Sequence, residues 1–234
     1  MDIQKPTGAG GMKMIQKILG KPLEPGKLGV LMARAGVGKT ACLTHIALEY
    51  LLGGSSVLHV CIDEIPEKIK VWYKELLKNS LSSQSSESFA EIAHSTERNR
   101  FILAYLHHTF NPEKLEQSLQ NLKEQAGFHP DLVILDGLDF DRVQRSTLEM
   151  LQNFAQKHNV PIWMSARTHR HISMTNDKGI PYPCDKNDDL FESILLLEPL
   201  TETIQIKVLK HGAQYSPSSP EVFLNSQTYL LQQG

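Results

Sequence analysis

The chain alternates short apolar runs with segments whose apolar residues recur every three or four positions, from residue 28 to about residue 165. The runs predict strands and the recurring patterns predict helices. Strands that alternate with helices are typical of a parallel sheet with helical crossovers, so we predict an α/β fold whose mostly parallel sheet is flanked by helices. The predicted strands are 28–32, 57–62, 101–106, 132–135 and 161–165, and the predicted helices are 41–51, 66–77, 112–125 and 147–158.

The pattern changes after residue 190, where short apolar runs follow one another without helices between them. These runs predict antiparallel strands added at one edge of the sheet. We expect one domain over residues 1–234, with an N-terminal extension at 1–20 and the β additions at 190–234. The weakly patterned segment 80–88 predicts a loop, and the long polar segment 168–189 is the better candidate for a functional loop. The added strands are predicted at 194–197, 203–209, 222–224 and 229–231.

Composition limits the class of protein. The chain has 234 residues and is 41% hydrophobic, which is enough for one sizeable globular core. Its formal net charge of −2 gives no overall electrostatic reason to bind nucleic acid. Three cysteines without a C-x-x-C pair argue against a disulfide framework or a thiolate zinc site. Because no apolar run is long enough for a signal or a membrane span, we expect a cytoplasmic protein without a membrane partner.

A glycine-containing loop lies between the first predicted strand and the following helix. Residues 33–40 read Ala-Arg-Ala-Gly-Val-Gly-Lys-Thr, which matches G-x-x-x-x-G-K-[ST] except for Ala33 at the first position. Glycines allow backbone N–H groups to turn toward phosphates, and the helix directs its positive dipole end at them. The segment therefore predicts a phosphate-binding loop for ATP with Mg²⁺. The residues expected to contact the nucleotide are Arg34, Ala35, Gly36, Val37, Gly38, Lys39, Thr40 and Ala41.

Three side chains have expected roles around the phosphates and the metal. Lys39 would reach the β- and γ-phosphates, and the Thr40 hydroxyl would bind Mg²⁺. Asp136 ends the predicted strand 132–135 and would be the Walker-B acid that supports Mg²⁺ through its water shell. The alternative is that Asp136 only forms a turn. Gly137 follows it, so the glutamate that many ATPases carry at that position is absent.

Two consecutive carboxylates, Asp63 and Glu64, end the predicted strand 57–62. Carboxyl ends of parallel strands open into one crevice, and alternating side chains send one of the pair toward the γ-phosphate. We assign Glu64 as the base for the attacking water and Asp63 as its neighbour. The alternative is that both only cap the helix that begins at Pro66.

Three segments together resemble the RecA-like ATPases, the family of KaiC, RadA and DnaB. They are Leu23–Gly26, the loop 33–40, and Ile62–Pro66. In that family a glutamate at the end of the second strand activates water, which implies this role for Glu64. The segment Ile162–Arg167 is similar to the strand whose end senses the γ-phosphate, although the usual polar amide is absent.

The resemblance also implies a homo-oligomer. Lys207–Gly212 is similar to a late strand that sends a lysine and an arginine into the neighbouring subunit's nucleotide site. Lys210 would be that cation, while no arginine stands in the segment. Because arginine is the better phosphate clamp, its absence favours slow hydrolysis.

The resulting interpretation is a slow Mg²⁺-dependent ATPase that controls its own assembly or a protein partner. A DNA-directed motor or recombinase is the first alternative, against which stand the acidic pI and the short connection 137–146. The second is a small-molecule kinase in which residues 168–189 close over an acceptor. The third is a nucleotide-binding interaction module that hydrolyses nothing. Arg167 and the basic residues after it are either phosphate contacts or a solvated face.

Overall fold

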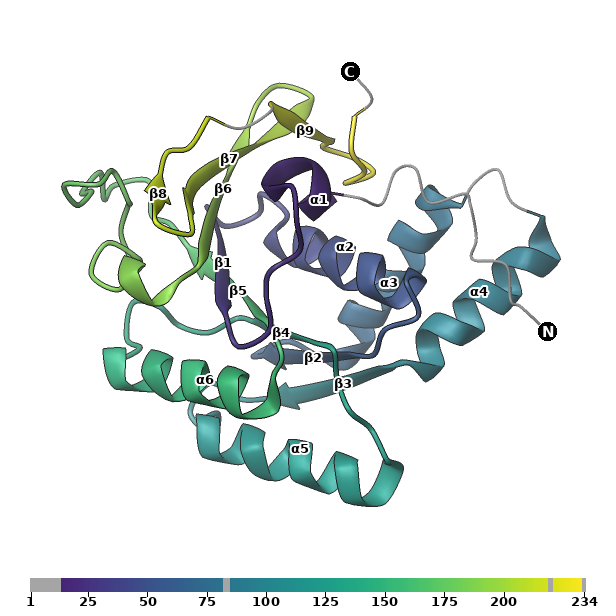
Figure 1. Cartoon of the computed structure of the whole chain (residues 1–234). Helices are drawn as coiled ribbons and strands as arrows, with labels where there is room; N and C mark the ends of the chain where they lie inside the picture. The colour runs from purple at the N-terminus through teal and green to yellow at the C-terminus, as the bar shows by residue number, and fades with distance from the viewer. Residues whose placement is uncertain (1–13, 82–84, 219–220, 233–234) are drawn as a thin grey trace.

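The computed structural model describes residues 14–81, 85–218 and 221–232. Within these residues, nine strands form one sheet with helices on both faces (Figure 1). The strands are β1 (Leu28–Ala33), β2 (Val57–Ile62), β3 (Arg100–Tyr105), β4 (Leu132–Asp136), β5 (Ile162–Arg167), β6 (Ser193–Pro199), β7 (Thr203–His211), β8 (Gln214–Tyr215) and β9 (Val222–Asn225). The helices are α1 (Met14–Leu19), α2 (Lys39–Leu52), α3 (Pro66–Ser80), α4 (Ser86–Arg98), α5 (Pro112–Ala126) and α6 (Arg145–His158), with a 3-10 helix η1 at Asp188–Leu190.

The strand order is β3, β2, β4, β5, β1, β6, β7, β8, with β9 also paired to β7. The strands from β3 to β6 are parallel to their neighbours. β7 is antiparallel to β6, and β8 and β9 are antiparallel to β7. The predicted α/β fold with a mostly parallel sheet and antiparallel strands at its C-terminal end is confirmed.

Alternating strand side chains divide the core between the two faces of the sheet. In β1, Val30 and Met32 pack with α5 and α6, whereas Leu31 and Ala33 pack with α1, α2 and α3. All six residues of β1 are buried, as expected for a strand covered on both faces. Because β1 and α2 lie at the centre of these layers, the loop between them is held on rigid elements.

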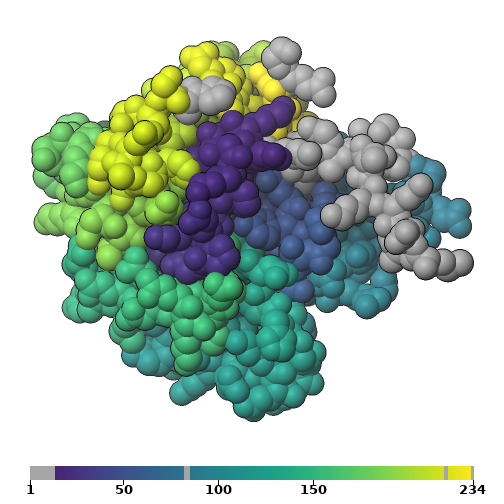
Figure 2. Space-filling view, viewed as in Figure 1, coloured from purple at the N-terminus to yellow at the C-terminus, as the bar shows by residue number. Residues whose placement is uncertain are grey.

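The ends of the chain depart from the expected pattern. Residues 1–13 of the expected extension lie outside the described residues, but α1 packs Met14, Ile15 and Ile18 into the core. In Figure 2 the purple segment that contains α1 lies along the boundary between the yellow C-terminal strands and the rest of the molecule. The predicted strand 229–231 is wrong, because only Leu231 forms an isolated bridge, to Leu224.

Helix α4 also differs from the prediction. It begins inside the segment 80–88, which we expected to be a loop and of which residues 82–84 lie outside the described residues. Its N-cap is Ser85, whose side chain accepts a hydrogen bond from the Ser88 N–H. The serine-rich composition therefore marks a helix start rather than a loop.

All three cysteines are buried and unpaired, which confirms the expected absence of a disulfide framework. In the described part of the chain, none of the helices has the length and apolarity needed to cross a bilayer.

Candidate functional site

The predicted loop connects β1 to α2 at the carboxyl end of the sheet. Gly36 and Gly38 have φ angles of 79° and 101°, a region that glycine adopts without strain. Gly38 is the N-cap of α2 and has no side chain to occupy the first N–H groups of the helix. These N–H groups are therefore available to an anion. Along the loop, Arg34, Ala35 and Gly36 are exposed, Val37 to Thr40 are half-buried, and Ala41 is buried.

The Lys39 side chain folds back across the loop. Its Nζ donates hydrogen bonds to the carbonyl oxygens of Ala33 at 3.1 Å and Arg34 at 3.0 Å. Burial lowers the pKa of Lys39, the Asp136 carboxylate raises it, and the Arg167 cation lowers it. The ammonium group is thus held at the mouth of the loop between one anion and one cation.

Thr40 and Asp136, which were predicted to share a metal, lie in direct contact. The Thr40 hydroxyl donates to Asp136 Oδ2 at 2.6 Å, although the two residues are 96 positions apart. Ser165, within β5, donates to Asp136 Oδ1 at 2.5 Å and accepts from the Gly137 N–H at 3.1 Å. Ser165 is buried and had no predicted role. It orients the carboxylate toward Thr40.

The carboxyl ends of β2 and β4 are in contact beside this group. Gly137 has a φ of 97°, and a Cβ there would lie 2.4 Å from the Ile62 carbonyl oxygen. Only glycine allows this approach without displacing the backbone. The contact sets Asp63, which follows Ile62, next to the strand end that carries Asp136.

The carboxylates of Asp63 and Glu64 both bind groups close to them in the structure. The Asp63 carboxylate accepts from the His107 N–H at 2.6 Å. Glu64 accepts from the Ile65 N–H at 3.2 Å and forms an ion pair with Lys68 in α3. Glu64 therefore sits at the N-terminus of α3, where the helix-cap alternative also places it. The contacts found in the described residues do not join either carboxylate to Lys39, Thr40 or Asp136.

Arg167 is a second cation beside the loop. It ends β5 directly opposite Ala33, and the next residue, Thr168, donates its N–H to the Ala33 carbonyl oxygen at 2.9 Å. The side chain is exposed, and no ion pair holds it among residues 14–81, 85–218 and 221–232. Arg167 thus lies at the end of the strand beside the one that leads into the loop, with its side chain exposed.

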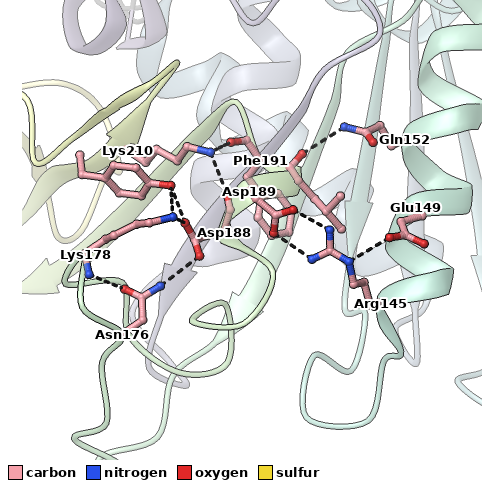
Figure 3. A network of polar contacts seen from close by, with 11 residues as sticks. Arg145, Glu149, Gln152, Asn176, Lys178, Asp188, Asp189, Phe191 and Lys210 are labelled. Carbon is pink, nitrogen blue, oxygen red and sulfur yellow. Dashed lines mark hydrogen bonds and ion pairs between the residues drawn. The ribbon is translucent and has the colours of Figure 1, made fainter.

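Lys210 lies on β7, away from the loop, and is buried within the chain. It is 6% exposed, and its Nζ donates to the carbonyl oxygens of Asp188 at 2.7 Å and Phe191 at 2.6 Å (Figure 3). Burial lowers the pKa of this ammonium group. In this arrangement the Lys210 side chain is turned toward the interior of its own chain.

The same network fixes the end of the segment 168–189. The Asp188 carboxylate accepts from the Tyr215 hydroxyl at 2.5 Å, from Lys178 at 3.1 Å and from Asn176 at 3.0 Å. On the other side, Arg145 of α6 binds the neighbouring Asp189 carboxylate at 2.8 and 2.5 Å (Figure 3). The segment we expected to be a functional loop is thus tied at this end to β8 and α6.

No protein-family model matches the chain, and comparison with the curated proteins finds no relative.

Proposed function

We propose that the chain is a RecA-like P-loop protein that binds MgATP and hydrolyses it slowly, as a switch for its own assembly or for a protein partner. The observation that carries this proposal is the 2.6 Å hydrogen bond between Thr40 and Asp136, at the start of a helix that follows a glycine loop. Two side chains 96 positions apart meet where a phosphate-bound Mg²⁺ would need both of them.

The sheet topology supports the resemblance to RecA-like proteins. β5 lies between β1, which leads into the loop, and β4, which carries Asp136. After β1 the chain continues to β2, which lies on one side of β1 in the sheet, whereas β6 pairs with β1 on the other side. Ligands of open α/β sheets bind at such a switch point, outside the carboxyl ends of the strands. The glycine loop lies at that point.

The donor atoms fit the ligand that the fold implies. Mg²⁺ prefers oxygen ligands and is usually held by one or two carboxylates together with substrate phosphates. Thr40 Oγ1 and Asp136 supply such oxygens, and Ser165 fixes the second carboxylate oxygen. No cluster of three or more histidine, cysteine or acidic residues occurs in the part of the chain described, so no all-protein metal cage competes with this site.

When bound, Mg²⁺ would offset the negative charge of the phosphates. Lys39 would hold the β- and γ-phosphates from the mouth of the loop, and the free N–H groups of α2 would bind their oxygens. Arg167 would approach the terminal phosphate from β5. Glu64 would accept a proton from the attacking water after its exposed ion pair with Lys68 opens, which costs little.

The binding step is tested with Lys39→Ala. We expect calorimetric titration to show a loss of MgATP affinity of about ten- to hundredfold, because a charge-assisted contact to phosphate is removed without removing core volume. The matched control is Lys27→Ala, since Lys27 lies beside the opposite end of β1 and pairs with Glu192 on the surface. Equal affinities for the wild type and the folded Lys39→Ala variant would contradict the proposed function.

A further inference from the structure

Tyr229 lies against the glycine loop although it is 191 positions after Gly38. A Cβ on Gly38 would lie 2.2 Å from Tyr229 Cε1, and 3.0 and 3.1 Å from Cδ1 and Cζ. Cδ1 and Cζ, the ring atoms bonded to Cε1, are both 0.8–0.9 Å farther from the position of this Cβ than Cε1 is. The Cβ position therefore lies close to the plane of the ring, and the ring turns its edge to the loop. Its faces are not used by this contact. Gly38 thus has to be glycine both for its φ angle and for this approach.

A second aromatic ring completes the arrangement. Trp72 of α3 packs against Tyr229 with the ring centroids 5.4 Å apart and the planes at 89°. Both residues are half-buried rather than enclosed in the core. The two rings form an aromatic corner beside the residues that would bind phosphate.

The backbone holds Tyr229 in a conformation that it would not adopt by itself. Its φ is 55°, a left-handed value that costs a residue other than glycine about 1–2 kcal/mol. Asn225 stabilises the turn, because its side-chain oxygen accepts from the N–H groups of Gln227 and Thr228, both at 2.9 Å. The Tyr229 N–H donates to the Asn225 carbonyl oxygen at 2.9 Å. His45 Nδ1 of α2 lies 3.0 Å from the Tyr229 carbonyl oxygen. Strain of this kind persists where surrounding contacts enforce it, and such positions concentrate at ligand sites.

We propose that Tyr229, supported by Trp72, is the platform on which the base of the bound nucleotide stacks. This inference rests on the proposed function, because the glycine loop has to hold the phosphates before the base can reach the ring. Every nucleobase has a π-face that stacks on an aromatic side chain, so the platform recognises a nucleoside as a class rather than one base. A ring lying flat on the loop would cover its N–H groups, whereas an edge contact leaves a face for the base.

The experiment separates recognition of the base from recognition of phosphate. Affinities for MgATP and for magnesium tripolyphosphate, which has no base, are measured for the wild type, Tyr229→Ala and Tyr229→Phe. We expect Tyr229→Ala to lower the affinity for MgATP about tenfold while the affinity for tripolyphosphate changes less than about twofold. Tyr229→Phe keeps the ring and should retain the wild-type ratio of the two affinities. Thermal unfolding identifies any loss of the C-terminal turn.

Trp72 provides a second readout because it contacts Tyr229. The chain has two tryptophans, and the other, Trp163, is fully buried in β5. In a Trp163→Phe background, ATP should change the emission of Trp72 more than tripolyphosphate does. The proposal is contradicted if Tyr229→Ala leaves the ratio of the MgATP and tripolyphosphate affinities unchanged. It is also contradicted if both affinities rise, because the ring would then have been covering the loop. If the wild type binds neither compound, the proposed function itself fails, and this inference fails with it.

Discussion

At the scale of single residues, the two carboxylates after β2 differ in how firmly their neighbours hold them. Asp63 is held by the His107 N–H and has a left-handed φ of 56°, so its side chain is committed to the turn after β3. Glu64 has an exposed partner, Lys68, one turn along α3. An exposed pair of this kind is worth well under about 1 kcal/mol, so Glu64 is the carboxylate that can turn toward a substrate.

We therefore expect Glu64→Gln to bind MgATP as the wild type does but to release phosphate about a hundredfold more slowly. The amide keeps the shape and the bond from Ile65 N–H but cannot accept a proton. Asp63→Asn retains an acceptor for the His107 N–H and should be milder. Lys68→Ala is the matched control, since it removes the ion pair while leaving the carboxylate and should not slow turnover. If Asp63→Asn lowered the rate of phosphate release more than Glu64→Gln does, Asp63 would be the base instead. If neither variant lowered this rate, neither carboxylate would take part in the mechanism.

At this scale the sequence predicts what is local. The loop 33–40 could be found because its residues are consecutive, and Asp136 because it ends an apolar strand. Ser165 and Tyr229 could not be found, since their importance comes from contacts across the sheet and between segments far apart in the chain. No spacing rule brings Tyr229 to Gly38. The turn that begins at Asn225 and ends with the left-handed Tyr229 does so.

At the scale of elements, α1 is attached through a half-buried carboxylate, that of Glu49. The backbone N–H of Met14 donates to Glu49 of α2, and so does that of Ile15. Burial raises the pKa of Glu49 from its ordinary 4.5 to about 8, although these two N–H groups lower it. His45 Nε2 lies 3.8 Å from the same carboxylate. The attachment of α1 therefore couples to protonation of Glu49.

The sign of this coupling follows from the two pKa values. Between pH 4.5 and about 8 the unfolded chain releases the Glu49 proton while the folded chain keeps it, so stability falls as the pH rises through this range. We expect Glu49→Gln, which still accepts the two N–H bonds, to remove this contribution of up to a few kcal/mol. Thermal unfolding at pH 5, 6.5 and 8 should show the melting temperature of the variant rising relative to that of the wild type as the pH rises. The control is Glu91→Gln, on the exposed surface of α4, whose stability should depend on pH as that of the wild type does. If Glu49→Gln also showed the wild-type pH dependence, the pKa of Glu49 would not be raised.

Prediction of elements succeeded where burial dominates. β2 and β4 are entirely buried, and each was predicted at its observed start because apolar residues dominate it, with His59 alone interrupting the run in β2 and four consecutive apolar residues in β4. Helix α4 was missed because it carries only two large apolar residues, Phe89 and Ile92, and both are only partly buried against the core. The run at 229–231 has the composition of a strand, but the Asn225 side chain bonds the following N–H groups and turns the chain instead.

At the scale of the whole molecule, the question is how subunits would share a nucleotide. The resemblance to RecA-like proteins implies a homo-oligomer in which a cation from one subunit serves the next, and light scattering with MgATP tests that assembly. Lys210 was expected to be this cation, yet it bonds Asp188 and Phe191 of its own chain. For Lys210 to serve a shared site, it would have to leave these two carbonyl oxygens.

We expect Lys210→Met to act on stability rather than on catalysis. The substitution keeps the apolar stem but leaves two buried carbonyl oxygens without their donor, so the free energy of unfolding should fall by about 2–4 kcal/mol. Denaturant titration measures this loss, and phosphate release per folded molecule should stay near that of the wild type. Lys207→Met is the control, since Lys207 lies on the same strand with an exposed ion pair to Glu198 and should change neither quantity. The contrary result would be a folded Lys210→Met protein that binds ATP, turns it over slowly, and recovers activity when mixed with Glu64→Gln. That recovery would show that Lys210 acts in the neighbouring subunit's site. In the mixture, only an interface between the two variants could combine an intact Glu64 with an intact Lys210.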